Sequence, residues 1–421
     1  MTPYVITFIV MVGVFMIGCF AFKLPVGVSM LIAALCGALE GGLGTETIRM
    51  MVEGEFGYVD TILTIGCAMI FMKVIEGSGA LDALSSLIIE KFHRFPAVLL
   101  VLIMLIIMFP GMITGSSTAA VLSAGSIMAP VLALMGIDAV TSGSIIAMGA
   151  LLGMIAPPVN TAALIICAGI DVPYVGFEGP LALITFPLAI LFVLLLGYKQ
   201  ARHMDYEKLK PIRKQYGVRI YIPLLVLVAL MVIFKVLKLG EDIGMPLMFL
   251  ISAAVGLFTG KKINVLTAVP EAIRTAAPVM GILMGVGMFI EVMTATGVRG
   301  LVVISCLRLP STLWLLACAI SIPLFGAVSS YGACSVLGVP FAYIYASLLG
   351  GNSVVVLAAI SLIAAVGDMM PPTALAGLFA AQVTGVEKYT KILKRCIVPI
   401  IILLVYACFF LANSKLIAGL F

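Results

Sequence analysis

Residues 145–170 read IIAMGALLGMIAPPVNTAALIICAGI. These 26 residues carry no charge, and a helix of that length can cross a hydrocarbon core of about 30 Å. Two consecutive prolines, Pro157 and Pro158, stand at the centre. Because proline lacks an amide donor and clashes with the preceding turn, they predict two half-helices. Broken helices occur in membranes where their backbone groups line an enclosed cavity or bind an ion. The alternative is a proline kink that neighbouring helices satisfy.

The second half of the chain repeats this pattern. Residues 367–373 (GDMMPPT) correspond to residues 153–159 (GMIAPPV) at an offset of 214 positions. Interrupted helices at matching places in two halves are the sequence pattern that points most directly to a transporter binding site. The repeat predicts two broken helices, at about 145–170 and at about 353–386.

The composition excludes a soluble domain, because 63% of the 421 residues are hydrophobic and 10% are charged. The apolar runs are continuous, whereas β-barrel strands alternate, so we expect an all-α polytopic protein in a lipid bilayer. The nine cysteines lie in apolar runs without metal-ligand spacing, and we interpret them as packing residues. The net charge of +5 indicates no nucleic-acid partner, since membrane topology alone places basic residues at membrane boundaries.

The first half, residues 1–198, contains a candidate re-entrant hairpin at about 95–137. This stretch is uncharged, but the polar residues 114–118 (TGSST) interrupt it. Each arm is marginal for a full crossing, so we expect a helical hairpin whose tip stops inside the membrane. Two ordinary short helices with an external turn are the alternative. The other expected elements are helices ending near 22 and 39, an amphipathic interfacial segment at 40–57, and helices at 58–79 and 180–198.

Residues 199–219 form a basic linker, and residues 220–421 repeat the order of the first half. A second hairpin is expected at about 310–350, with the tip at residues 329–332 (SSYG). The other expected elements are helices at 220–237 and 245–260, an amphipathic connection at 261–274, and helices at 277–297 and 396–413.

This pattern gives five crossings and one hairpin in each half, or about ten transmembrane helices and two hairpins. Because five is odd, the second half should be inverted relative to the first. Basic residues concentrate on the cytoplasmic side of membrane proteins, which places the linker in the cytoplasm and both chain termini outside. The expected location is the inner (plasma) membrane.

Three motifs carry a resemblance to a known family. They are GMITGSSTAAVLSAGSIMAP (111–130), APPVN (156–160) and MPPTALAGLFAAQVTGV (370–386). Together they resemble the large membrane subunit of TRAP transporters, the DctM family, within the ion transporter superfamily of elevator-type carriers. The chain differs from the common pattern at Lys73, where the family usually has glutamate, and in its second hairpin.

The resemblance implies sodium-coupled uptake of an organic anion, such as a carboxylate or dicarboxylate, without an enzymatic reaction or a cofactor other than the coupling sodium ions. It also implies two partners, a small four-helix membrane subunit and an extracytoplasmic substrate-binding protein. A stand-alone ion-coupled carboxylate carrier of the same superfamily is the alternative.

Sodium prefers oxygen ligands, so hairpin hydroxyls and carbonyls at helix breaks suit it. The expected sodium ligands of the first half are Gly115, Ser116, Ala156, Pro157 and Asn160. Those of the second half are Ser329, Gly332, Asp368, Met370 and Thr373. Between them, helix N-termini can hold a carboxylate, and the expected substrate-binding residues are Ser117, Thr118, Asn160, Thr161, Ser330 and Thr373.

Several of these residues have simpler explanations. A membrane serine or threonine often bonds only the carbonyl four residues earlier. Asp368 could cap a half-helix or reach a wet vestibule. Lys73 and Glu76 are expected to form an ion pair in the scaffold.

An intramembrane protease and a passive channel are two other classes of function. Residues 366–375 faintly resemble an intramembrane aspartyl protease. Such an enzyme needs two catalytic aspartates within membrane spans, and Asp368 is the only aspartate in the middle of an expected span. A passive channel is also open, although inverted repeats with broken helices favour alternating access.

Overall fold

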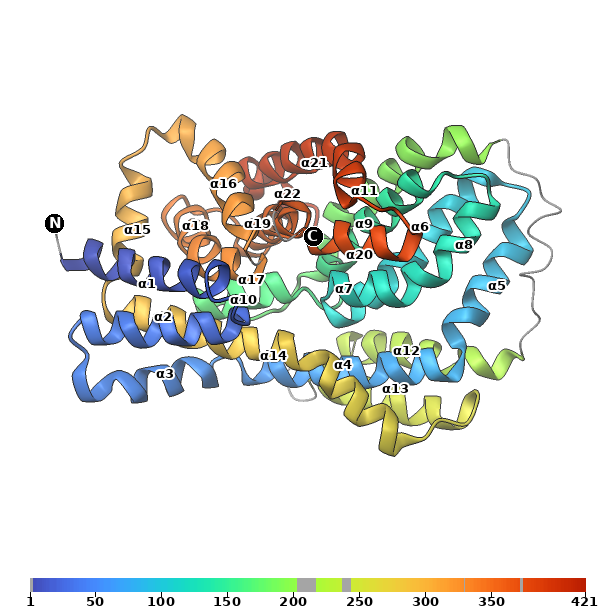
Figure 1. The fold of residues 1–421 in the computed structure, drawn as a ribbon, viewed down its shortest axis with the longest axis horizontal. Helices are drawn as coiled ribbons and strands as arrows, with labels where there is room; N and C mark the ends of the chain where they lie inside the picture. Colours follow the sequence, from blue (N-terminus) through green and yellow to red (C-terminus); the bar gives the residue numbers. More distant parts are fainter. Residues whose placement is uncertain (1–2, 203–216, 237–243, 329, 372–373) are drawn as a thin grey trace.

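The structure is a computed structural model, and it describes residues 3–202, 217–236, 244–328, 330–371 and 374–421. Within these residues every regular element is a helix (Figure 1). Seven described segments are long and apolar enough to cross a membrane, and shorter apolar helices accompany them. The chain is therefore an all-α polytopic membrane protein, as predicted.

The helices of the first half follow the predicted order, with a break at each expected place. They are α1 (Pro3–Phe20), α2 (Val26–Glu40), α3 (Thr47–Phe56), α4 (Val59–Ser78), α5 (Ala80–Phe92), α6 (Pro96–Thr114), α7 (Ser117–Ala120), a π-helix (Val121–Gly125), α8 (Ser126–Leu134), α9 (Ala139–Ile155), α10 (Thr161–Gly169) and α11 (Glu178–Ala201).

The second half repeats this order after the linker, of which residues 203–216 lie outside the described residues. Its helices are α12 (Ile222–Val236), α13 (Met245–Thr259), α14 (Val265–Ala295), α15 (Val298–Leu307), α16 (Ser311–Gly326), α17 (Ser330–Ala333), a π-helix (Cys334–Gly338), α18 (Val339–Ala342), a π-helix (Tyr343–Leu348), α19 (Ser353–Ala365), a 3₁₀ turn (Val366–Met369), α20 (Leu375–Thr384), α21 (Tyr389–Ala412) and α22 (Ser414–Ala418).

Two sequence predictions about helices were wrong. Residues 261–274 and 277–297 were expected to be a connection and a separate helix, but both belong largely to α14. The Asn264 side chain accepts a hydrogen bond from the Leu266 amide and caps this long helix, which continues through Pro270 and Pro278. Helices α2, α3 and α4 pack on α14, whereas Pro270 and Pro278 themselves lie at exposed positions.

Helices α5 and α15 were not predicted. Gly79 and Gly297, with φ of 82° and 76°, end the preceding helices in the left-handed region. The chain therefore turns into a short new helix at each place. Each of these two helices connects two groups of helices described next.

The first group, here called the scaffold, consists of α1–α4 and α12–α14. It includes the row of helices α2, α3, α14, α4 and α13 along the lower side of Figure 1. Its helices approach closely at glycines: a Cβ on Gly27 would lie 2.1 Å from the carbonyl oxygen of Gly281. Gly54 and Gly287 make a similar contact between α3 and α14. Small residues at such crossings let membrane helices pack backbone to backbone.

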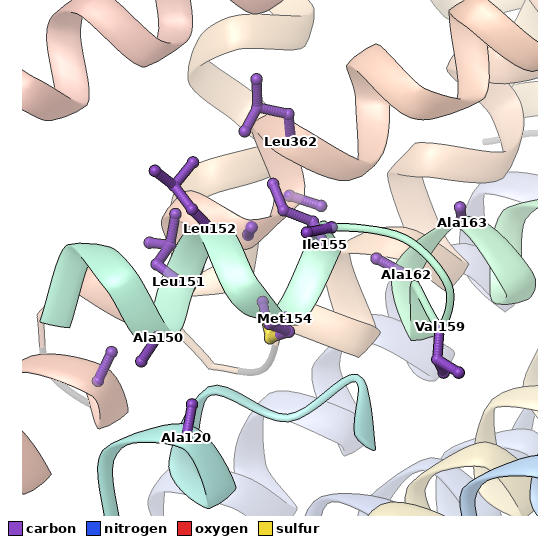
Figure 2. Close-up of a cluster of buried hydrophobic side chains, with 14 of the residues drawn as sticks. Ala120, Ala150, Leu151, Leu152, Met154, Ile155, Val159, Ala162, Ala163 and Leu362 are labelled. Carbon is purple, nitrogen blue, oxygen red and sulfur yellow. The ribbon is translucent and has the colours of Figure 1, made fainter. Parts of the chain in front are cut away.

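The second group, here called the hairpin domain, consists of α6–α11 and α16–α22. Its two central helices, α9 and α19, are buried on every side from Thr141 to Ile155 and from Val355 to Ala365. Figure 2 shows apolar side chains of α9 packed between Ala120 and Leu362, which come from the two halves. Among the described residues, the scaffold touches this domain chiefly through α4 with α6 and through α14 with α10, with α17 and with the π-helix Cys334–Gly338; Phe15 of α1 also stacks on Phe325 of α16.

Packing partners are exchanged between the halves. Helix α2 packs on α14, and the corresponding α13 packs on α4. In the hairpin domain α9 packs on α20 and α21, whereas α19 packs on α10 and α11. The same pairing therefore occurs twice with the halves interchanged.

A glycine pair locks each hairpin to a broken helix. A Cβ on Gly153 would lie 2.5 Å from the carbonyl oxygen of Met108, and one on Gly111 would lie 2.9 Å from the backbone of Gly153. In the second half, a Cβ on Gly367 would lie 2.6 Å from the backbone of Gly326. Only glycine permits these contacts, which set the position of each hairpin tip.

Candidate ion and substrate site

The tip of the first hairpin is a short turn between α6 and α7. Gly115 adopts a φ of 63°, and a Cβ there would lie 2.0 Å from Oγ1 of Thr161, so this position requires glycine. Ser116 follows in extended conformation, and its hydroxyl accepts a hydrogen bond from the Ala119 amide at 3.3 Å. The polar cluster thus turns the chain and starts the returning helix, as predicted.

The first break separates α9 from α10 at the predicted place, and Asn160 organises it. Its Oδ1 accepts a hydrogen bond from the Ala163 amide at 2.9 Å, which caps α10. Its Nδ2 donates to the carbonyl oxygen of Ile155 at 3.0 Å and to the hydroxyl of Ser361 at 2.8 Å. Asn160 is fully buried, so its side chain joins the break to α19 of the other half.

The loop after α10 covers the same break. The hydroxyl of Tyr174 donates to the carbonyl oxygen of Pro158 at 3.1 Å and accepts from the Asn160 amide at 3.2 Å. Its ring stacks on Phe177, with 4.7 Å between centroids. Figure 2 shows the connection from Ile155 through Val159 to Ala162 running as an open loop. Tyr174 therefore satisfies backbone groups that the two prolines leave without helical partners.

Replacing Asn160 with alanine is expected to destabilise the folded protein by about 1–3 kcal/mol, because a helix cap and buried hydrogen bonds are lost together. Transport should fall with the amount of folded protein. Thermal melting of the purified variant and of Asn413→Ala, a matched control at the exposed end of α21, would measure this. A normal melting temperature in Asn160→Ala would contradict the role.

The second break lies between α19 and α20, and Asp368 stands in its 3₁₀ turn. The Asp368 side chain is buried, with 5% exposed. Its Oδ2 accepts a hydrogen bond from the Ser117 hydroxyl at 2.5 Å. Since Ser117 begins α7, this bond links the first hairpin tip to the break of the second half. The corresponding residue of the first half is Met154, so the two breaks differ in charge.

A second contact between the halves ends at the same tip. The hydroxyl of Tyr331, in α17, donates to the carbonyl oxygen of Gly115 at 2.9 Å. The hydroxyl of Thr161, at the start of α10, donates to the same oxygen at 3.4 Å. The first tip, the first break and the second hairpin therefore meet at one carbonyl group.

These groups open onto a cavity of about 430 Å³ between the hairpin domain and the scaffold. Its polar lining comes from the first hairpin (Thr114, Ser116, Ser117, Thr118 and Ser123), from the second half (Tyr331 and Asp368) and from the scaffold (Lys73, Glu76 and Thr275). The remaining wall is mainly apolar. A cavity of this size and composition is typical of sites for small molecules.

Lys73 forms the predicted pair with Glu76 and a further bond across the scaffold. Its Nζ lies 3.2 Å from Glu76 of the same helix and 3.3 Å from Glu271 of α14. About a quarter of the Lys73 side chain is exposed, and it is the cation among the described residues of the cavity wall. The Lys73–Glu76 pair therefore belongs to the scaffold and also lines the cavity.

The structure groups the predicted site residues differently from the sequence prediction. Four of them line the cavity together: Ser116, Ser117, Thr118 and Asp368. Thr161 and Asn160 lie behind the tip and are buried, as is Ala156. Pro157 is half-buried.

In the second half, α17, which contains Gly332, contacts the 3₁₀ turn that holds Asp368. The amide of Met370 donates to Gly367 and its carbonyl accepts from Ala374, both at 3.0 Å. Ser329 and Thr373 lie outside the described residues, and so does the side chain of Ser330.

Sequence reasoning missed three polar residues of this region, Tyr331, Tyr174 and Ser361. Tyr331 directly follows the serines of the predicted second tip, so its position in the sequence could have marked it as a site residue. Its hydrogen bond to the Gly115 carbonyl, however, depends on how the two halves pack. Tyr174 and Ser361 lie in a loop and in an apolar helix, where nothing in the sequence pairs them with Asn160.

Comparison with known proteins supports the motif resemblance. The family model described as "Tripartite ATP-independent periplasmic transporter, DctM component" matches residues 12–414. No curated protein matches the chain. Among solved structures, the Alcanivorax borkumensis YdaH transporter, whose crystal structure is described as having an unusual topology, matches with a TM-score of 0.62 and 16% identity. The match covers 89% of this chain and 88% of the other, and at this identity it shows a shared fold. With nearly its whole length matched by the family model, the chain belongs to the DctM family, the large membrane component of tripartite ATP-independent periplasmic transporters.

Proposed function

We propose that the protein couples sodium entry to the uptake of a small carboxylate, as the permease subunit of a tripartite system. The observation that carries this proposal is the Ser117–Asp368 contact at the cavity wall. It brings the first hairpin tip and the second break to one place, where a cation and a substrate can bind together.

Sodium fits the chemistry of this place. An ionised carboxylate in the membrane interior costs several kcal/mol unless it is paired. Hydroxyl and carbonyl oxygens around Asp368 can complete the coordination of a hard cation. Ser117 from the first half and Asp368 from the second are the ligands we propose for it.

A carboxylate substrate fits the same cavity, next to the proposed cation. The helix that begins at Ser117 presents its N-terminus to the cavity, where backbone amides and the helix dipole favour an anion. The Lys73 ammonium adds a positive charge on the scaffold wall. Because Lys73 and Glu76 carry opposite charges, one bound sodium ion would offset the charge of Asp368 and so favour anion binding.

The two groups of helices suggest how the site moves. The interchange of packing partners between the halves supports an inverted repeat of residues 1–198 and 220–421. Because, among the described residues, the hairpin domain touches the scaffold through few helix pairs, we infer that it moves past the scaffold as a unit. This is alternating access of the elevator type.

The proposed topology places the linker and the residues before α14 in the cytoplasm of an inner-membrane protein. In a variant without native cysteines, Lys262→Cys should react with an impermeant maleimide only after the membrane is opened. Glu46→Cys, in the segment before α3, should react from outside in intact cells. Labelling of Lys262→Cys from outside would reject the inverted arrangement.

The family assignment leads us to propose a small four-helix subunit and an extracytoplasmic binding protein as partners. Purified chain should be reconstituted alone and together with a small four-helix subunit and a binding protein of the same organism. We expect carboxylate uptake only in the complete set. Full uptake by the chain alone would instead establish a stand-alone carrier of the same superfamily.

A further inference from the structure

The two hairpins are not equivalent at their tips. By the spacing of the two glycine pairs, Tyr331 corresponds to Ser116 and Asp368 to Met154. A long polar side chain and a carboxylate of the second half therefore face the first tip, whereas the matching positions of the first half hold a short serine and an apolar methionine. The two contacts between tip and opposite half occur on the side where the cavity lies.

The two contacts act on neighbouring points of the tip. Tyr331 holds the Gly115 carbonyl at 2.9 Å, and two residues later Ser117 donates to Asp368 at 2.5 Å. Gly115 is the residue at which the backbone turns with a φ of 63°. Fixing its carbonyl therefore fixes the direction in which Ser117 leaves the turn.

We propose that Tyr331 is a positioning residue for the cation site: it holds the first tip so that the Ser117 hydroxyl and the Asp368 carboxylate bind one sodium ion jointly. The proposal rests on the proposed function and deepens it. Tyr331 is not among the proposed ligands; its hydroxyl holds the Gly115 carbonyl at 2.9 Å. It acts through Ser117, so its loss leaves the carboxylate in place but displaces the second ligand.

The test measures sodium binding directly, without a known substrate. The melting temperature of the full-length purified protein is followed as sodium chloride replaces potassium chloride at constant ionic strength. We expect the half-saturating sodium concentration of Tyr331→Phe to be about five- to tenfold higher than that of the wild type, the effect of one lost hydrogen bond. At sodium concentrations well above the dissociation constant, the melting temperature of the variant should rise with the logarithm of sodium concentration at the same slope as in the wild type.

Tyr406→Phe is the matched control. The Tyr406 hydroxyl also donates to a backbone carbonyl of the other half, that of Leu183 at 3.1 Å, but Tyr406 does not line the cavity. Both variants should melt slightly lower in potassium, whereas only Tyr331→Phe should change the sodium dependence. An equal sodium half-saturation in Tyr331→Phe and Tyr406→Phe would overturn the proposal and leave Tyr331 a structural residue.

A double-mutant cycle identifies the route of the effect. If Tyr331 acts through Ser117, then Ser117→Ala with Tyr331→Phe should bind sodium no more weakly than Ser117→Ala alone. Independent, multiplying losses would contradict the positioning role. A wild-type protein that sodium does not stabilise over potassium would instead reject the proposed sodium coupling, an outcome separate from the others.

Discussion

Replacing Asp368 with asparagine is expected to raise the sodium concentration for half-maximal uptake by about tenfold or more. Hydrogen bonds and contacts to a charged group each contribute about 1.5–3 kcal/mol, and asparagine removes the charge while keeping the size of the side chain. The Ser117 hydroxyl can still donate to the amide oxygen, so the tip should stay in place. The fold should therefore persist while sodium binds more weakly.

Uptake should be measured over a range of sodium concentrations at equal amounts of protein in the membrane. Asp60→Asn is the control, because Asp60 is an exposed carboxylate at the start of α4. It should leave the sodium dependence unchanged. An unaltered half-saturation in Asp368→Asn would show that Asp368 only caps the break or faces water.

The second large effect is expected at Gly153, where alanine should destabilise the protein by about 1–3 kcal/mol or more. Its Cβ would lie 2.5 Å from the Met108 carbonyl oxygen and 2.7 Å from the Met108 Cα. These are backbone atoms, so α6 must move away from α9. The tip of the first hairpin would then move away from Asp368. The transport rate per molecule of folded protein should therefore fall, in addition to the loss of stability.

Gly13→Ala is the matched control, because a Cβ on Gly13 meets no atom within 4 Å and the residue also lies in an apolar helix. Melting temperature and uptake should be compared for both variants. Equal behaviour of Gly153→Ala and Gly13→Ala would mean that the close contact of α6 and α9 does not position the tip.

The sequence predicts those elements that local chemistry determines. The chain breaks at both Pro-Pro pairs, between α9 and α10 and between α19 and α20, and it turns between α6 and α7 at the polar residues 114–118. The full length of α14 could not be predicted, because Pro270 and Pro278 favour the end of a helix, yet the helix continues through both. α5 and α15 are short, and their existence depends on how two groups of helices are connected.

The candidate site was predictable in its residue types but not in its pairs. The hydroxyl-rich tip and the buried carboxylate are visible in the sequence. However, Ser117 and Asp368 are 251 residues apart, and a search within each half assigns them to separate sites. Asn160 was expected as an ion ligand, and its cap and its bond to Ser361 appear only when α10 and α19 are placed together.

Proteoliposomes give the most direct test of whether sodium entry drives the uptake of a carboxylate. The chain, with its partner proteins if they are needed, is reconstituted and given a labelled carboxylate under an inward sodium gradient, or under a proton gradient without sodium. We expect the labelled carboxylate to accumulate inside the proteoliposomes above its external concentration only under the sodium gradient. Equal rates under the proton gradient alone, or equilibration without accumulation under the sodium gradient, would contradict it.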